Sequence, residues 1–226
     1  MMAKAVLACE TIRDELEHTL ADAGGDFRVC WIESALHNFP DLLRERLQET
    51  LDSLDGCDRV LMAFGHCGNA LDDLHTGGYE LILPDTDDCI SLLLGSTQSR
   101  LEYSMEGGTY FLTRGWLRGE RNIWAEYLYA REKYGEKSAL EIMAVMLKNY
   151  RYLSVLDTQS YDLDSVFPTT KEIADTLNLT HRVIPGTTRY LRDLLTGPWD
   201  DDRFLRYPPY SRIGEWRRAG QSPAPR

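Results

Sequence analysis

Short apolar runs alternate with helical patterns along the first half of the chain. Predominantly apolar stretches at residues 5–9, 27–32, 59–64 and 79–84 predict buried β-strands. Between them, Ile12, Leu16 and Leu20 are spaced by four, as on one face of a helix. A second helix is expected to open at Pro40, with its buried face formed by Leu43, Leu47, Leu51 and Leu54. Strands alternating with helices are typical of an α/β protein with a parallel sheet.

The second half of the chain continues this alternation less regularly. Further strands are predicted at residues 107–112, 152–156 and 181–184. Helices are predicted at residues 70–75, at 122–150 with a break near Gly135, at 169–177 from a capping box, and at 187–195. We therefore expect one α/β domain over residues 1–205, with a mainly parallel, Rossmann-like three-layer sheet and its site at the carboxyl ends of the strands. Residues 206–226 are expected to form an extended, disordered basic tail.

Composition narrows the possible partners and the cellular location. The chain carries 25 basic and 36 acidic side chains, a formal net charge of −11, which disfavours nucleic acid and anionic membranes as partners. It has no apolar run of about 18 residues that would predict a transmembrane helix. Five cysteines, an odd number, favour reduced thiols in the cytoplasm over a disulfide framework.

Three cysteines suggest a metal site. Cys9, Cys67 and Cys89 each follow a different predicted strand, so a parallel sheet could bring their sulfurs together at one edge. Three soft sulfur ligands with a histidine or water in the fourth position suit zinc or iron. His37 or His66 could be that histidine or a proton shuttle, and Glu10 or Asp88 could transfer protons. Cys30 and Cys57 are expected to lie outside the site.

The same residues allow other interpretations. Buried cysteines are common as inert core residues. The segment Gly65-His66-Cys67-Gly68-Asn69 also resembles a nucleophile elbow, which would make Cys67 the attacking group of a metal-free hydrolase or transferase. Against this, Asn69 stands where such an elbow has its second glycine. A third possibility is a non-enzymatic carrier of a metal or cofactor.

Several polar residues at turns are candidates for contacts with a small-molecule substrate. We expect these to be His66, Asn69, Ser96, Thr109 and Tyr110. The turns Gly95-Ser96-Thr97 and Gly107-Gly108-Thr109 could offer backbone amides to an anion, although neither is a P-loop or a dinucleotide fingerprint. No nucleotide cofactor is therefore predicted. Asp85, Asp87 and Asp88 are as consistent with helix capping as with a site.

A set of motifs in order resembles the uncharacterised family called domain of unknown function 1638, over about residues 4–205. The motifs are Ala8-Cys9-Glu10-Thr11, Leu36-His37-Asn38-x-Pro40, Gly65-x-Cys67-Gly68-Asn69, Asp88-Cys89-Ile90 with Gly95-Ser96, Gly108-Thr109-Tyr110 with Gly115-Trp116, Asp157-Thr158, and Leu194-Leu195-x-Gly197-x-Trp199-Asp200. His66 occupies a position expected to vary in that family, so the resemblance favours His37 as the functional histidine.

The resemblance also implies a metabolic setting. Members of the family look to be encoded beside corrinoid-dependent methyltransferase systems, which implies a role in corrinoid-linked methyl or one-carbon metabolism. A corrinoid protein or a methyltransferase would then be a partner. The working hypothesis is a thiolate-ligated metal protein, either a metal-dependent transferase or an accessory factor, with Cys9, Cys67 and Cys89 as ligands.

Overall fold

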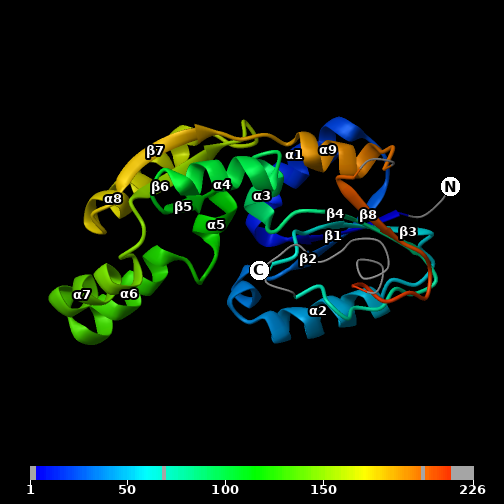
Figure 1. Ribbon diagram of the computed structural model, residues 1–226, viewed down its shortest axis with the longest axis horizontal. Coiled ribbons are helices and arrows are strands. Elements are labelled where there is room, and N and C mark those ends of the chain that lie inside the picture. The colour runs from blue at the N-terminus through cyan, green and yellow to red at the C-terminus, as the bar shows by residue number, and fades with distance from the viewer. Residues whose placement is uncertain (1–3, 68–69, 200–201, 215–226) are drawn as a thin grey trace.

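The strands of this protein are divided between two sheets. The computed structural model describes residues 4–67, 70–199 and 202–214 (Figure 1). The larger sheet has the order β2-β1-β3-β4-β8 and the smaller sheet the order β5-β6-β7. Their bounds are β1 Lys4–Cys9, β2 Phe27–Ile32, β3 Arg59–Ala63, β4 Glu80–Pro84, β5 Thr109–Leu112, β6 Tyr152–Asp157, β7 Thr180–Pro185 and β8 Phe204–Tyr207.

The larger sheet is parallel except for its last strand. Strands β1, β2, β3 and β4 pair in parallel, while β8 pairs with β4 in the antiparallel direction. Helices α1 (Arg13–Ala23) and α9 (Arg189–Thr196) pack together on one face, and α2 (Pro40–Asp52) covers the other (Figure 1). Strands β1, β3 and β4 are buried along nearly their whole length because both faces are covered. This is the predicted α/β three-layer arrangement with a mainly parallel sheet, and the prediction is confirmed.

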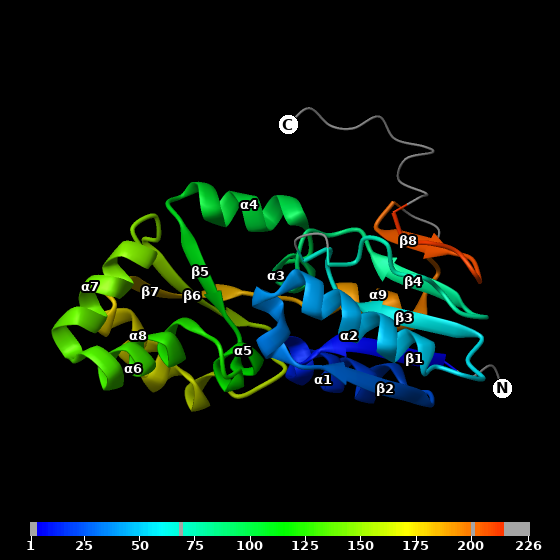
Figure 2. The same ribbon diagram turned by 90° about the horizontal axis from the view of Figure 1, so that it is seen from below.

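The smaller sheet is wholly parallel and has its own apolar cluster. Its core face packs Leu112, Leu153 and Val155 against α6 (Ile123–Tyr134), α7 (Glu136–Met146) and α8 (Phe167–Thr176). On the opposite face, Leu156 and Ile184 join the cluster of the larger sheet. Helix α4 (Thr97–Met105) lies on one side of β5, and α6, α7 and α8 lie on the other (Figure 2).

The carboxyl ends of strands from both sheets meet near the end of β1. The short helices α3 (Cys89–Leu93) and α4 carry the chain from β4 to β5, and α9 follows β7 on the return to the larger sheet. After β5, α5 (Arg114–Arg118) packs on the 3₁₀ turn Glu10–Ile12 that follows β1. Thr113 donates its hydroxyl hydrogen to the carbonyl of Thr11 at 2.9 Å. A Cβ at Gly115 would lie 2.4 Å from that same carbonyl oxygen, so only glycine allows this approach.

Four local predictions were wrong. Residues 70–75 form turns and a bridge to Arg212 rather than a helix. The helix predicted from Thr169 begins at Phe167, because Pro168 suits the first helical turn better than the expected capping box. The segment after β5, expected to be a loop, forms α5. The predicted domain boundary at 205 falls inside β8, and Tyr207 and Ile213 beyond it are buried.

Helix α4 and strand β8 had no counterpart in the predictions. The tail from residue 215 onward, expected to be disordered, lies outside the described residues. That residues 1–205 form one domain stays a prediction. Among the described residues, no helix combines the length and the apolar character that crossing a membrane requires.

Candidate functional site

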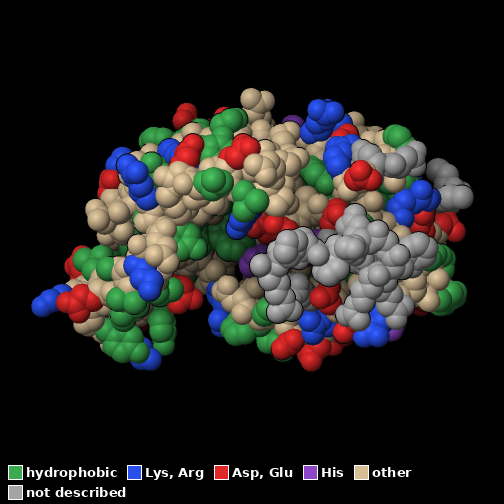
Figure 3. Space-filling model, viewed as in Figure 1, with side chains coloured by type: hydrophobic (Ala, Val, Ile, Leu, Met, Phe, Trp, Pro, Cys, Tyr) green, Lys and Arg blue, Asp and Glu red, His purple; other side chains and the backbone are tan. Residues whose placement is uncertain are grey.

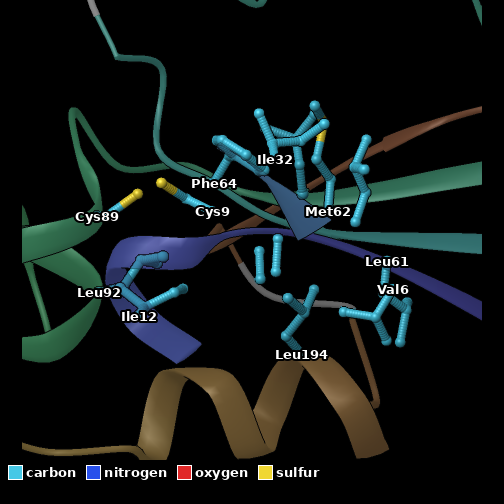
Figure 4. Close-up of a cluster of buried hydrophobic side chains, with 14 of the residues drawn as sticks. Val6, Cys9, Ile12, Ile32, Leu61, Met62, Phe64, Cys89, Leu92 and Leu194 are labelled. Atoms are coloured by element: carbon cyan, nitrogen blue, oxygen red, sulfur yellow. The ribbon is translucent and has the colours of Figure 1, made fainter. Parts of the chain in front are cut away.

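Three buried cysteines gather at the carboxyl edge of the larger sheet. Cys9 is the last residue of β1, Cys67 follows β3, and Cys89 begins the helix that follows β4. These strands are neighbours in the sheet and run in parallel, so their ends lie side by side. The sulfurs of Cys9 and Cys89 point toward one another (Figure 4), and Cys89 also interacts with the thiol of Cys67. We call Cys9, Cys67 and Cys89 the thiol cluster.

The loop that carries Cys67 is held closely against the loop that carries Cys89. The amide of His66 donates to the carbonyl of Thr86 at 2.8 Å, and the amide of Cys67 donates to that of Asp87 at 2.9 Å. A Cβ at residue 65 would lie 2.4 Å from the Cα of Asp88, which explains the glycine there. Cys67 itself has a φ of 44°, a left-handed conformation that is uncommon for a residue other than glycine.

The environment of the cluster keeps two of its sulfurs protonated. The pKa of Cys9 is raised well above its ordinary value by the neighbouring thiol of Cys89 and by burial. The pKa of Cys89 is also raised well above its ordinary value, first by the thiol of Cys67 and then by burial, while Cys9 and the Gly65 backbone oppose the shift. At neutral pH both are therefore thiols unless a cation replaces their protons.

The thiols are gathered, but they do not form a ready-made metal site. In the parts of the chain that the structure describes, no group of three or more His, Cys, Asp or Glu side chains has the geometry to hold a metal ion. The expected convergence of the three cysteines is thus seen, while their role as metal ligands stays a prediction.

A cavity of about 290 Å³ adjoins the thiol cluster, and Cys89 forms part of its wall. The other walls come from the turns after β1 and β2, from α4, and from β5 with α5. The lining includes His37, Asn38, Asp88, Arg100, Tyr110 and Trp116. The space-filling view shows a hollow between the parts of the molecule built on the two sheets, with hydrophobic side chains in its depth (Figure 3).

Asp88 is the carboxylate of this cavity, and its oxygens are already engaged. Oδ1 accepts from the backbone amide and the hydroxyl of Ser91, at 2.8 and 2.9 Å, which caps α3. Oδ2 forms an ion pair with Nε of Arg100 at 2.5 Å. The capping role and the position in a site, treated as alternatives from the sequence, coexist in this residue.

His37 lies across the cavity from these groups. Its ring packs edge-on against Trp116, with 5.2 Å between ring centroids. Burial lowers the pKa of His37, and the charge of Asp88 opposes that shift only in part. The imidazole is therefore neutral at neutral pH and able to accept a proton.

Tyr110 belongs to the part of the cavity wall that β5 forms. Its hydroxyl oxygen accepts from the indole Nε1 of Trp116 at 3.1 Å and from the amide of Ile123 at 3.3 Å. Burial raises the pKa of Tyr110, so its hydroxyl keeps its hydrogen. Thr109, the preceding residue, also lines the cavity and donates to the carbonyl of Tyr103.

Other predicted site residues lie elsewhere. Glu10 forms an ion pair with Arg13 at 2.9 Å and lines a separate cavity with Arg118. His66 lies 3.3 Å from Asp85 through its Nε2. The hydroxyl of Ser96 caps α4 by accepting from the amide of Ser99. Asn69 lies outside the described residues.

Arg100 is the charged side chain of the cavity that could not be predicted from the sequence. It lies in α4, a helix without a fully buried residue, so no apolar stripe predicted the helix or the face that Arg100 occupies. Ser96 followed by helix-compatible residues was the only local signal, and it indicates a helix start without indicating what the helix packs against.

Comparison with known proteins identifies a family and nothing more specific. A family model described as "Protein of unknown function (DUF1638)" matches residues 31–195, well over half of the chain. The matched range contains His37, Cys67, Cys89 and Arg100 and begins after Cys9. No curated protein and no solved structure matches the chain.

Proposed function

We propose that this chain, which belongs to the DUF1638 family of proteins of unknown function, binds a transition metal through its thiol cluster and acts on a small molecule in the adjoining cavity. One observation carries the proposal. Three cysteines from three neighbouring strand ends lie together, and one of them, Cys89, is also part of the cavity wall. A metal held by these sulfurs would therefore lie beside a space of substrate size.

The donor set is chemically suited to zinc or iron. Cys9, Cys67 and Cys89 are soft ligands, and three protein ligands leave a fourth position open, as in catalytic zinc sites. When bound, such a metal activates a substrate thiol or a water by lowering its pKa. Because the three sulfurs are not already at ligand geometry, binding would require them to draw closer together and to lose their protons.

Two residues of the cavity are proposed to handle protons. His37 is neutral at neutral pH and so can accept a proton from a bound substrate. Asp88, held by Ser91 and Arg100, would stabilise the resulting positive charge on the imidazole. We do not assign this role to Glu10, because it pairs with Arg13 and lines a different cavity.

The metabolic setting is proposed from the family resemblance. We propose an enzyme, or an accessory factor, of corrinoid-linked methyl metabolism, with a corrinoid protein or a methyltransferase as partner. A thiolate-bound metal would fit this setting, because activating a thiol as a methyl acceptor is chemistry that zinc sites perform. Zinc and iron remain alternatives.

A second candidate is a metal-free enzyme in which Cys67 is the nucleophile. The left-handed backbone of Cys67, on a turn after a strand, favours it, because nucleophile elbows are strained in this way. Among the described residues that line the cavity, however, the cysteine is Cys89. A substrate in this cavity would meet Cys89 before Cys67.

Metal analysis and alkylation separate the two candidates. Untagged protein purified without oxygen would be analysed for transition metals, as wild type and as Cys67→Ser, with Cys30→Ser as the matched control. Metal binding that is lost in Cys67→Ser and kept in Cys30→Ser supports the metal protein. Metal-free wild-type protein in which Cys67 alone is alkylated rapidly overturns that proposal in favour of the nucleophile.

A further inference from the structure

The cavity beside the thiol cluster has hydrogen-bond donors without acceptors. Arg100, whose side chain is 32% exposed, pairs with Asp88 through Nε and lies over the ring of Phe111. Its two terminal amino groups have no partner among the residues that the structure describes. A guanidinium with a free planar edge at a cavity wall suits a carboxylate, which it can hold through two parallel hydrogen bonds.

Tyr110 supplies a second free donor. Its hydroxyl oxygen accepts two hydrogen bonds, from Trp116 and from the amide of Ile123. Its own hydrogen has no acceptor within the described part of the chain. Because a buried hydroxyl normally donates as well as accepts, the free hydrogen indicates an acceptor on a ligand or a water.

Two further side chains of the cavity wall also lack hydrogen-bond partners among the described residues. The imidazole nitrogens of His37 and the side-chain amide of Asn38 make no hydrogen bond to any described residue. The threonine hydroxyls at the wall are different, because each already donates: Thr11 to the sulfur of Cys9, Thr109 to Tyr103 and Thr113 to Thr11. We call Arg100, Tyr110, His37 and Asn38 the donor wall.

The carboxylate of the cavity, by contrast, is occupied. Asp88 accepts two hydrogen bonds from Ser91 and forms an ion pair with Nε of Arg100. The cavity therefore has no free carboxylate to accept from Arg100 or Tyr110, and a ligand that brings an acceptor would satisfy both donors. The remaining wall is apolar or aromatic, with Ile12, Phe111 and Trp116, which suits an organic body of small size.

From these contacts we infer that the substrate is a small organic monocarboxylate whose carboxylate binds between Arg100 and Tyr110 and whose body packs on the aromatic wall toward Cys89. A single guanidinium, already paired on one side with Asp88, matches one negative charge. A phosphate would bring up to two charges against the same single cation and the nearby carboxylate, so it fits less well. The inference rests on the proposed function in taking this cavity as the substrate site.

The test measures binding of benzoate, phenylacetate and hexanoate to metal-free protein by calorimetry. Benzamide serves as the uncharged control and inorganic phosphate as the competing anion. We expect the acids to bind and benzamide and phosphate to bind about tenfold more weakly or not at all. The result that overturns the inference is binding of none of the acids, or equal binding of benzamide or phosphate.

Variants then locate the binding. Arg100→Gln should weaken acid binding roughly tenfold or more, since a charge-assisted pair is lost, and Tyr110→Phe should weaken it several-fold. The matched control is Arg59→Gln. Like Arg100, Arg59 is partly exposed (25%), pairs with a carboxylate, that of Glu80, and lies over an aromatic ring, that of Trp199. Arg59 is at the end of β3 opposite to the thiol cluster. Unchanged binding in folded Arg100→Gln, or an equal loss in Arg59→Gln, contradicts the inference. If Arg100→Gln does not fold, Tyr110→Phe decides in the same way.

Because this experiment uses metal-free protein, it is independent of the metal. If the acids bind but the thiol cluster binds no metal, only the proposed function is overturned. Metal binding without acid binding would remove only the present inference.

Discussion

The thiol cluster and the donor wall adjoin at Cys89, yet they are built in opposite ways. The thiol cluster comes wholly from strand ends of the larger sheet, and its sulfurs interact with one another. The donor wall joins the turn after β2 to Arg100 and Tyr110, which belong to α4 and to the smaller sheet. Arg100 and Tyr110 line the cavity, and each keeps a donor that has no acceptor among the described residues. The first region is chemically prepared for a cation, and the second for an anion.

The largest effect is expected from Gly65→Ala, which tests whether the two loops of the thiol cluster must touch. The added Cβ would lie 2.4 Å from the backbone of Asp88, so the loops must separate, at a cost of about 4 kcal/mol in the free energy of unfolding. Denaturant unfolding measures this cost. In the control Gly24→Ala, the residue has a φ of 64° but open space around it, so only backbone strain of about 2 kcal/mol is expected. Similar costs for the two variants would show that the loops are not closely clamped.

The next test concerns Glu15, a carboxyl at the junction of the two sheets. It is fully buried, its Oε1 accepts from Thr158 at 3.1 Å, and its Oε2 has no partner. Burial, with a smaller contribution from Asp14, raises the pKa of Glu15 to about 7, against the opposing effects of Thr158 and Arg114.

The sign of the pH dependence follows from that shift. Between pH 4.5, the ordinary carboxyl value, and about 7, the folded protein keeps a proton that the unfolded chain releases. The stabilisation is therefore complete below pH 4.5 and lost as the pH rises through 7, by up to about 3 kcal/mol. Glu15→Gln should remove this slope, while Glu17→Gln, an exposed change on the same helix, should keep it. A wild-type protein whose stability is flat or rises over this range would contradict the assignment.

The third test separates the two regions through the residue that they share. Cys89→Ser should lower metal affinity by about a hundredfold or more, because a hydroxyl is a poor substitute for a thiolate ligand. Binding of benzoate should change little, because the carboxylate is placed at Arg100. Competition with a chelator measures the first quantity and calorimetry the second, with Cys30→Ser as the control. Loss of both metal binding and benzoate binding in a folded Cys89→Ser protein would mean that the two regions form one site.

The smallest effect is expected from Asp88→Asn. An asparagine oxygen can still accept from Ser91 and cap α3, while the negative charge that competes for Arg100 is removed. Benzoate affinity should therefore rise by roughly threefold. Weaker binding would show that Asp88 orients Arg100 more than it competes with the ligand.

The two regions were also unequally predictable from the sequence. Cys9, Cys67 and Cys89 follow apolar runs separated by helical patterns, and parallel pairing necessarily places such strand ends at one edge. Their convergence could therefore be predicted without knowing any contact. His37 and Asp88 were found for the same reason, because they lie in the turns that follow β2 and β4.

Arg100, the cation of the donor wall, could not be derived in this way. Arg100 reaches the cavity because the chain leaves the larger sheet after β4, forms α4, and starts a second sheet at β5. Nothing in the local pattern says in which sheet a strand will pair, since β5, β6 and the strands of the larger sheet share one kind of apolar run. The antiparallel β8 was missed because Phe204–Tyr207 is short and lies among Pro, Asp and Arg residues. Glu10 was misplaced because it lies in the 3₁₀ turn Glu10–Ile12, where it pairs with Arg13.

The central claim, that the thiol cluster binds a transition metal, is tested most directly by titrating reduced, metal-free protein with Co²⁺ in the absence of oxygen. Cobalt reports its ligands through thiolate-to-metal charge-transfer absorption and through the intense visible bands of tetrahedral sites. The account predicts that one equivalent of Co²⁺ binds and gives both signals. Protons should be released on binding, because two of the thiols start protonated. Both signals should be lost in Cys89→Ser but not in Cys30→Ser. Binding without thiolate absorption, or signals that survive in Cys89→Ser, would contradict it.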